Sequence, residues 1–192
     1  MQKHDFEGIT YNNITDEIYV IIEGRDDIFV LDTELIPKAN SIIKIDREDS
    51  NGKTVLVKDK ENGLEGITIY NNTIYVANQS FNKWPQEDPS VILKLFLNDS
   101  THASIDDVIP SEYVNISGMC VWGNTLYIVS DTDNELITYD MTNHKFGSAV
   151  RLNKKFPLLK GSGLEGIAID NNGFLYLADD TKGKIYKFNL NH

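Results

Sequence analysis

Residues 63–78 read Gly-Leu-Glu-Gly-Ile-Thr-Ile-Tyr-Asn-Asn-Thr-Ile-Tyr-Val-Ala-Asn, which is two short apolar runs separated by a pair of asparagines. The runs are too short for ordinary helices, and their alternation of residue types favours strands. Asparagine tolerates the positive φ angles that a tight hairpin turn requires. The stretch therefore predicts two antiparallel strands, the first of which begins at Glu65-Gly66.

The same pattern occurs four times in the 192 residues. Three copies contain Glu-Gly, the third contains Ser-Gly, and a tyrosine follows ten to twelve residues later; the copies begin at Glu7 with Tyr19, Glu65 with Tyr75, Ser117 with Tyr127, and Glu165 with Tyr176. These positions lie 58, 52 and 48 residues apart. A strand-built repeat of roughly this length is typical of the blades of a β-propeller.

We therefore predict an all-β fold, a β-propeller with four blade repeats in this chain. Alternating runs such as Leu136–Asp140 and Ile185–Asn189 predict a third strand in each repeat. The fourth repeat ends after its third strand, so the ring encoded here is expected to be incomplete. Residues 1–192 are interpreted as one domain, with repeats at about 5–60, 61–112, 113–160 and 161–192.

Two segments of the first half are expected to be long loops between strands two and three of their repeats. They are Gly24–Asn40 and Ser80–Pro89. Long loops on a rigid scaffold commonly form binding walls, although a purely decorative role accounts for them equally well. The incomplete ring would also leave edges at Phe6–Tyr11 and Ile185–Leu190, which could pair with another chain. The chain would then be a fragment, a tight four-blade ring or part of an assembly.

Composition restricts the function further. The net charge of −11 and the pI near 4.7 disfavour nucleic-acid binding, which needs a surplus of Lys and Arg. The acidity either serves solubility or gathers carboxylates around a cation. The single cysteine, Cys120, allows no disulfide within the chain and is expected to pack in the core. We expect no signal peptide and no membrane insertion, because no apolar stretch approaches spanning length.

The repeat also predicts a site. The innermost strand of a blade lines the central channel, so Glu7, Glu65 and Glu165 are expected to converge at one mouth. Strand two returns to the same mouth, where it ends on a second set of carboxylates, Glu23, Asp131 and Asp180. Oxygen ligands of this kind favour Ca²⁺ or Mg²⁺ over zinc. The alternative is that each glutamate bonds backbone amides of a neighbouring blade and acts as a structural latch.

Other motifs do not point to catalysis. The run Gly161–Gly166 matches G-x-G-x-x-G, but a strand follows it where a dinucleotide site needs a helix. The four histidines are scattered over expected loops and termini, and no nucleophile–histidine–acid arrangement is apparent.

The ordered series DFEGITYN, GLEGITIYNNTIYVAN, ISGMCVWGNTLYIVSD and GLEGIAIDNNGFLYLADD resembles the SdiA-regulated, YjiK-like proteins. The resemblance covers nearly the whole chain and implies a five-bladed β-propeller with a bound calcium ion. The chain matches the last four blades of that pattern, so the resemblance implies an N-terminally truncated propeller. It also implies an extracytoplasmic or cell-envelope setting, for which this chain carries no export signal.

The function expected from these observations is a non-enzymatic, calcium-binding propeller that recognises a ligand or protein partner. The metal ligands are expected to be Glu7, Glu65, Glu165, Glu23, Asp131 and Asp180. The alternative is a metal-dependent esterase or lactonase, similar to the phytase-like and gluconolactonase-like propellers. In such an enzyme the ion would polarise a carbonyl or activate water.

Overall fold

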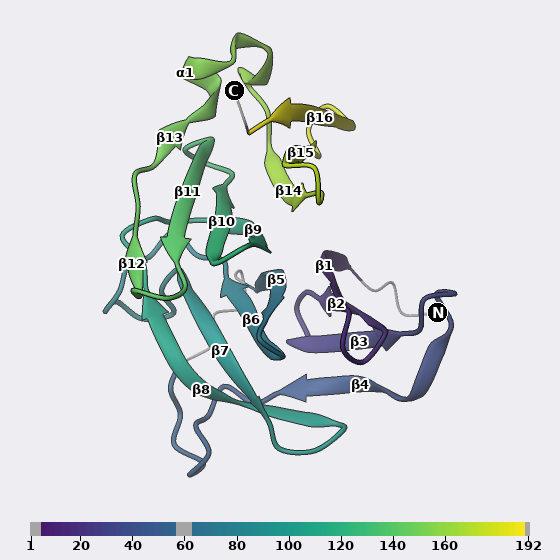
Figure 1. Cartoon of the computed structure of the whole chain (residues 1–192). Coiled ribbons are helices and arrows are strands. Elements are labelled where there is room, and N and C mark those ends of the chain that lie inside the picture. The colour runs from purple at the N-terminus through teal and green to yellow at the C-terminus, as the bar shows by residue number, and fades with distance from the viewer. Residues whose placement is uncertain (1–4, 57–62, 191–192) are drawn as a thin grey trace. The chain divides into compact units, whose positions relative to one another are not determined.

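The computed structural model describes residues 5–56 and 63–190, and these residues are almost entirely strands and turns (Figure 1). The chain forms two compact units, Met1–Val114 and Asn115–His192. Among the described residues no helix has the length and apolar character needed to cross a membrane. The all-β prediction is confirmed.

The first unit contains two antiparallel meanders of four strands each. The first meander consists of β1 (Phe6–Asn12), β2 (Glu17–Ile22), β3 (Asp27–Leu31) and β4 (Pro37–Ile45). The second consists of β5 (Leu64–Tyr70), β6 (Thr73–Asn78), β7 (Val91–Leu97) and β8 (His102–Pro110). The last strands of the two meanders, β4 and β8, pair in parallel and join them into one eight-stranded sheet (Figure 1).

The second unit contains two further meanders. The first consists of β9 (Ile116–Trp122), β10 (Thr125–Ser130) and β11 (Glu135–Asp140), and the short strands β12 (Lys145–Phe146) and β13 (Val150–Arg151) both pair with β11. A four-residue helix α1 (Leu152–Lys155) and a 3₁₀ turn (Pro157–Leu159) lead to the last meander. This meander consists of β14 (Leu164–Ile169), β15 (Phe174–Asp179) and β16 (Lys184–Asn189).

The Asn71-Asn72 turn adopts the predicted hairpin conformation. Asn71 and Asn72 join β5 to β6 with φ angles of 48° and 61°. Two successive residues with positive φ give a turn whose twist matches that of the flanking strands. The asparagine pair in the opening sequence therefore fixes the hairpin register.

The prediction of a long loop at Gly24–Asn40 is wrong, because β3 and the start of β4 lie in this segment. A short turn at Gly24–Asp26, with Gly24 at φ 73° and Asp26 at φ 56°, leads directly into β3. The run Ile42–Asp46, which the sequence pattern predicts as the third strand of the first repeat, instead forms the end of the fourth strand, β4, as far as Ile45. The second expected loop, Ser80–Pro89, is confirmed: it contains no strand and connects β6 to β7.

Each unit has its own apolar core. In the first unit the core includes Ile21, Ile28, Val76 and Leu93, all fully buried between the two meanders. In the second unit Val129, Leu164 and Leu177 are fully buried, and α1 contributes Leu152 to the same cluster. Burial of this many aliphatic side chains is the dominant favourable term in folding, at about 25 cal/mol per Å² of apolar surface.

An irregularity in the strand pairing marks the Glu-Gly or Ser-Gly dipeptide in every repeat. The register shifts by one residue between Phe6 and Ile9 in β1, and the same shift occurs between Leu64 and Ile67 in β5, between Ile116 and Gly118 in β9, and between Leu164 and Gly166 in β14. A bulge of this kind redirects the side chain at the extra residue. The repeat therefore sets Glu7, Glu65, Ser117 and Glu165 apart from the regular alternation of their strands.

Candidate functional site

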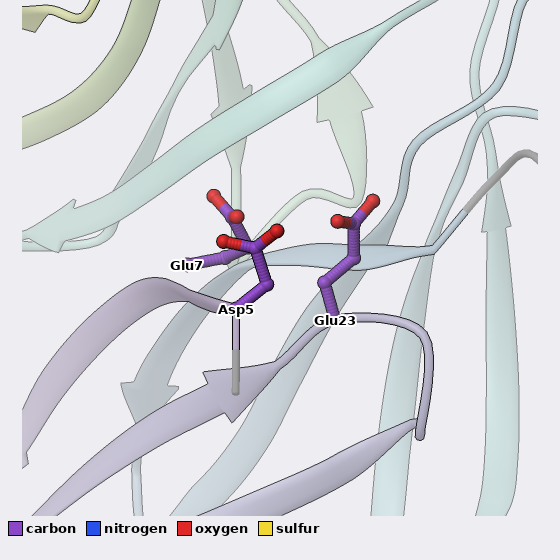
Figure 2. Close-up of side chains that lie close together, drawn as sticks. All are labelled: Asp5, Glu7 and Glu23. Carbon is purple, nitrogen blue, oxygen red and sulfur yellow. The ribbon is translucent and has the colours of Figure 1, made fainter. Parts of the chain in front are cut away.

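Three carboxylates of the first unit form a cluster. Asp5, Glu7 and Glu23 each offer one carboxylate oxygen, and these oxygens lie within 4.8 Å of one another. Figure 2 shows the three side chains extending to the same side of the ribbon. Asp5 is exposed, whereas Glu7 and Glu23 are partly buried. Among the described residues this acidic cluster, defined as Asp5, Glu7 and Glu23, is the one with metal-binding geometry.

A backbone hydrogen bond explains why residues from two strands meet here. The Glu23 N–H donates to the Asp5 carbonyl oxygen at 3.0 Å. Each of the other repeats has the equivalent bond at 2.9 to 3.2 Å, joining Gln79 to Gly63, Asp131 to Asn115 and Asp180 to Gly163. The end of strand two is thereby held beside the start of strand one in all four repeats. In the first repeat both positions carry carboxylates, and together with Glu7 they form the acidic cluster.

Glu65 lies on the strand next to this cluster. Strand β5 packs against β1, and a Cβ atom on Gly8 would come within 2.3 Å of the Glu65 carbonyl oxygen. Glu23 is held from the other side, because a Cβ on Gly63 would lie 2.6 Å from the Glu23 Cγ. Glu65 is only 8% exposed. The two glycines therefore let the motif strands of consecutive repeats approach closely, but Glu65 is not a member of the acidic cluster.

In the second unit Glu165 and Asp180 line one open depression of about 310 Å³. Ala178 and Ile185 form its apolar side, and Lys184 is also part of its wall. The structure thus brings two of the predicted metal ligands to one surface. A lysine ammonium group beside them reduces the negative charge available to a cation.

The serine that replaces glutamate in the third repeat has a structural partner. The Ser117 hydroxyl donates to the Leu164 carbonyl oxygen at 2.7 Å, and the residue is 3% exposed. This bond joins β9 to β14, the motif strands of consecutive repeats. Ser117 thus links consecutive repeats through a backbone carbonyl, whereas the latch through backbone amides that we considered for the glutamates stays a prediction.

The Asp131 carboxylate lies against the backbone of the next repeat. A Cβ on Gly163 would lie 3.3 Å from the Asp131 Oδ1. Burial raises the pKa of the Asp131 carboxyl; a hydrogen bond from the Leu164 backbone lowers it, and the nearby charge of Asp179 raises it again. The net effect is a raised pKa, so this carboxyl holds its proton more readily than an exposed aspartate does.

Asp179 is a buried carboxylate that sequence reasoning did not single out as a site residue. It is 2% exposed and accepts hydrogen bonds from the backbone of Gly163 and Lys182 and from the Tyr186 hydroxyl, at 3.1 to 3.2 Å. Burial acts to raise the pKa of Asp179, but these donors and the Ser162 hydroxyl hold that pKa below its usual range. Asp179 therefore acts as a structural anion that fixes the turn after β15.

Cys120 is not suited to nucleophilic chemistry. Burial raises the pKa of its thiol to about 12, and a hydrogen bond with the Ile169 backbone offsets this only slightly. The thiolate is the reactive form. At neutral pH the thiol is protonated, which agrees with the packing role expected from the sequence.

The sequence missed Asp5 as a member of the acidic cluster. The equivalent positions in the other repeats are Gly63, Asn115 and Gly163, none of which carries a charge. Comparison of the repeats therefore did not point to Asp5, because only the first repeat has a charged residue at this position. The signal in the sequence was Asp5, an aspartate two residues before Glu7. The end of strand two, which carries Glu23, returns to a position beside Asp5.

Solved structures with the same arrangement of strands belong to propeller-like proteins. Glutaminyl cyclase from Myxococcus xanthus matches with a TM-score of 0.59 at 10% identity, covering 96% of this chain and 65% of the cyclase. A luciferin-regenerating enzyme matches with a TM-score of 0.62 at 12% identity, covering 97% of this chain and 73% of that enzyme. A chain of a nidogen/laminin complex matches with a TM-score of 0.57 at 14% identity, covering 96% of this chain and 60% of that chain. At these identities the likeness shows the fold alone.

The fold and the repeated motif define the class of protein as a β-propeller. The sequence profile of the SdiA-regulated family matches residues 2–189, and the chain belongs to that family. No curated protein sequence matches the chain significantly. The chain spans 65% of the length of the cyclase, 73% of the luciferin-regenerating enzyme and 60% of the nidogen/laminin complex chain.

Proposed function

We propose that this chain is a calcium-binding propeller module that recognises a ligand or protein partner. The observation that supports the proposal most strongly is the acidic cluster, in which three carboxylate oxygens lie within 4.8 Å of one another. Calcium is a hard cation that takes six to eight oxygen ligands in irregular geometry. Three carboxylates supply six oxygens if all bind in bidentate fashion, and backbone carbonyls or water supply the rest.

The position of the cluster also supports a cation. Glu7 lies at a strand bulge, and the Glu23 side chain is packed against Gly63, so both carboxylates are held in place before any ion binds. Like charges held together repel one another unless a cation is present. Glu65, on the neighbouring strand β5, is a further candidate. Glu165, Asp131 and Asp180 belong to the second unit, and a role for them in ion binding stays a prediction.

Each meander is, in this proposal, one blade, and the four blades form part of a five-bladed ring. The supporting observations are the family membership and the four bulged motif strands.

The loop Ser80–Pro89 is the proposed recognition surface. Its apolar side chains Phe81 and Trp84 are 68% and 43% exposed. The base of the loop is fixed, because the Asn78 side chain donates to Asp88 at 3.0 Å and to the Pro89 carbonyl at 2.8 Å. Exposed aromatic side chains on a fixed loop offer contact area at low entropic cost, which favours binding.

Thermal unfolding in the presence of calcium tests the ion site. If Ca²⁺ binds the native state and its free concentration is a hundredfold above the Kd, the free energy of unfolding should rise by about 2.7 kcal/mol. Glu7→Gln and Glu23→Gln should reduce this gain, and Glu34→Gln, which removes an exposed carboxylate outside the cluster, should not. An unchanged melting temperature for the wild-type chain in calcium would contradict the proposal.

A second candidate is a metal-dependent hydrolase, and the specific observation in its favour is the raised pKa of Asp131. A carboxyl whose pKa lies nearer neutrality can exchange a proton with water or a leaving group. Ester and lactone substrates assayed with calcium and with a chelator separate the two functions. Turnover that requires calcium and disappears in Asp131→Asn would favour the enzyme, and absence of turnover would favour the binding module.

A further inference from the structure

A buried arginine joins two segments of the first unit that the proposed function uses. The Arg47 Nε donates to the Asp26 carboxylate at 2.9 Å, and the Arg47 Nη1 donates to the Asp88 carboxylate at 3.0 Å. The Arg47 side chain is 9% exposed, and the side chains of Asp26 and Asp88 are 6% and 2% exposed. All three residues belong to Met1–Val114, so this network lies within one unit.

Asp26 lies in the turn that carries Glu23, a member of the acidic cluster. This turn connects β2 to β3. The backbone of Asp26 has a φ of 56°, and its carbonyl oxygen accepts a hydrogen bond from the Ile45 N–H at 3.0 Å. A residue other than glycine keeps a positive φ only when its surroundings hold it there. The bond from Arg47 is therefore one of the contacts that hold the turn, and with it Glu23, in place.

Asp88 has the corresponding position at the base of the loop Ser80–Pro89. Its φ is 43°, so both aspartates that Arg47 binds have a positive φ. The Asp88 Oδ1 accepts from Arg47 and also from the Asn78 side chain, at 3.0 Å in each case. Asn78 is fully buried and donates in addition to the Pro89 carbonyl oxygen at 2.8 Å. One carboxylate oxygen thus ties the loop both to Arg47 and to the end of β6.

A second set of contacts leads from the loop back to the acidic cluster. Asn78 precedes Gln79, whose N–H donates to the Gly63 carbonyl oxygen at 2.9 Å. Gly63 in turn lies against Glu23, because a Cβ on Gly63 would be 2.6 Å from the Glu23 Cγ. A displacement of Glu23 therefore disturbs two sets of contacts, and both lead to the base of the loop.

We infer that Arg47 is a positioning residue that couples the acidic cluster to the loop Ser80–Pro89, so that a divalent cation bound at the cluster stabilises the loop. This inference rests on the proposed cation site. Without a cation the carboxylates of the cluster repel one another, and the repulsion acts on Glu23 and its turn. A cation removes the repulsion and favours the conformation of the turn in which Asp26 binds Arg47. Arg47 is then held beside Asp88, and opening of the loop has to break their bond.

The coupling acts in both directions. If the cation stabilises the loop, a molecule that binds the ordered loop must strengthen cation binding by the same factor. Couplings of this kind change affinities about 5–150-fold. Arginine suits this role because its planar guanidinium group binds two carboxylates in a fixed geometry, whereas a lysine ammonium group is a single point charge.

Amide hydrogen exchange, measured by NMR with calcium and with a chelator, tests the inference. The N–H groups of Asn82, Gln86 and Ser90 donate hydrogen bonds within the loop at 2.8 to 3.0 Å, so their exchange reports its opening. Saturating calcium should slow this exchange about fivefold or more. The Thr142 N–H, which donates to Asp140 at 2.8 Å in the second unit, should exchange at the same rate in both conditions.

Arg47→Lys removes the bridge between the two aspartates and keeps the positive charge. Isothermal titration should show that this variant still binds calcium, because Arg47 is not a member of the acidic cluster, but calcium should no longer slow exchange in the loop. A merely structural role of Arg47 would leave the calcium effect intact. Arg25→Lys is the matched control, because Arg25 lies in the same turn with a side chain that is 43% exposed, and its loop should respond as in the wild type.

If Arg47→Lys unfolds the chain, Asp88→Asn replaces it, because asparagine tolerates a positive φ and only the charge that Arg47 binds is removed. This variant should also bind calcium and lose most of the loop response. A wild-type chain that binds calcium without slower exchange in the loop would overturn the inference and leave the proposed cation site standing. A full loop response in Arg47→Lys would overturn the inference equally. A wild-type chain that binds no calcium would overturn both.

Discussion

Gly8 lies so close to Glu65 that a Cβ atom added to Gly8 would come within 2.3 Å of the Glu65 carbonyl oxygen. Real Cβ atoms do not approach a backbone oxygen this closely, and neither backbone segment can move without disturbing its strand pairing. The glycine of the Glu-Gly motif is therefore required by packing between repeats. Glu7, the glutamate beside it, lies at a strand bulge and is a member of the acidic cluster.

Gly8→Ala should accordingly destabilise the protein. Overpacking a well-packed interior costs about 1–3 kcal/mol, and the backbone contact puts this site at the upper end. Gly24→Ala is the matched control, because a Cβ there has open space and only the positive φ of 73° makes it unfavourable. The control should lose about 1 kcal/mol. Urea unfolding measures both, and equal losses would show that the contact with Glu65 is relaxed in solution.

A buried arginine is predicted to hold the recognition loop to the first meander. Arg47 donates to Asp26 at 2.9 Å and to Asp88 at 3.0 Å, and all three side chains are less than one tenth exposed. Removing one partner of a buried ion pair costs about 3–5 kcal/mol, because a buried charge loses its counter-ion. Arg47→Ala should show a loss of this size in chemical denaturation.

Arg25→Ala provides the comparison for the Arg47 prediction. Arg25 pairs with Asp27 at 2.8 Å, but its side chain is 43% exposed. Pairs with an exposed partner contribute about 0–1 kcal/mol. A loss for Arg47→Ala no larger than that for Arg25→Ala would contradict the role assigned to the buried network.

Asp179 should make the stability of the fold depend on pH. Its folded-state pKa is depressed, so its contribution is fully present above the unfolded-state pKa of about 3.9 and is lost as pH falls through the lower folded-state value. Asp179→Asn should cost about 2 kcal/mol at pH 7, since hydrogen bonds to a charged group are lost. The difference from wild type should shrink when unfolding is measured in acid.

Asp131 should behave in the opposite way, which makes Asp131→Asn the matched variant for Asp179. The folded-state pKa of Asp131 is raised, so its ionised form disfavours the fold above that pKa, and the penalty disappears as pH falls. Asp131→Asn should therefore be neutral or stabilising at pH 7. Similar losses for the two variants at pH 7 would contradict the two environments described for these carboxylates.

Much of the fold followed from the sequence because hairpin chemistry is local. The Asn71-Asn72 turn and the apolar runs around it predicted β5 and β6. Strand β3 was missed for a physical reason: Ile28 faces the core, while Phe29 lies on the other face of the same sheet, where it stacks on Phe6. A strand that is apolar on both faces lacks period-two alternation. The parallel pairing of β4 with β8 depends on contacts between Lys44 and His102, which no local pattern predicts.

The site was predictable to a similar extent. Glu7 and Glu23 were expected to lie together because strand two returns to the start of strand one, and they do so in the acidic cluster. Asp5 was missed because the other repeats carry uncharged residues at its position. Ser117 has the position in its repeat that glutamate has in the others, but its hydroxyl donates to the Leu164 carbonyl oxygen. Side-chain partners of this kind depend on distances between repeats, which the spacing in sequence does not give.

The most direct test of the calcium proposal is isothermal titration of the chelator-treated chain with Ca²⁺. The account predicts saturable binding at the acidic cluster, weakened about tenfold or more in Glu23→Gln, a change of about 1.4 kcal/mol in binding free energy. Glu34→Gln should bind as the wild type does. Absence of saturable binding in the wild type, or equal affinities in wild type and Glu23→Gln, would contradict it.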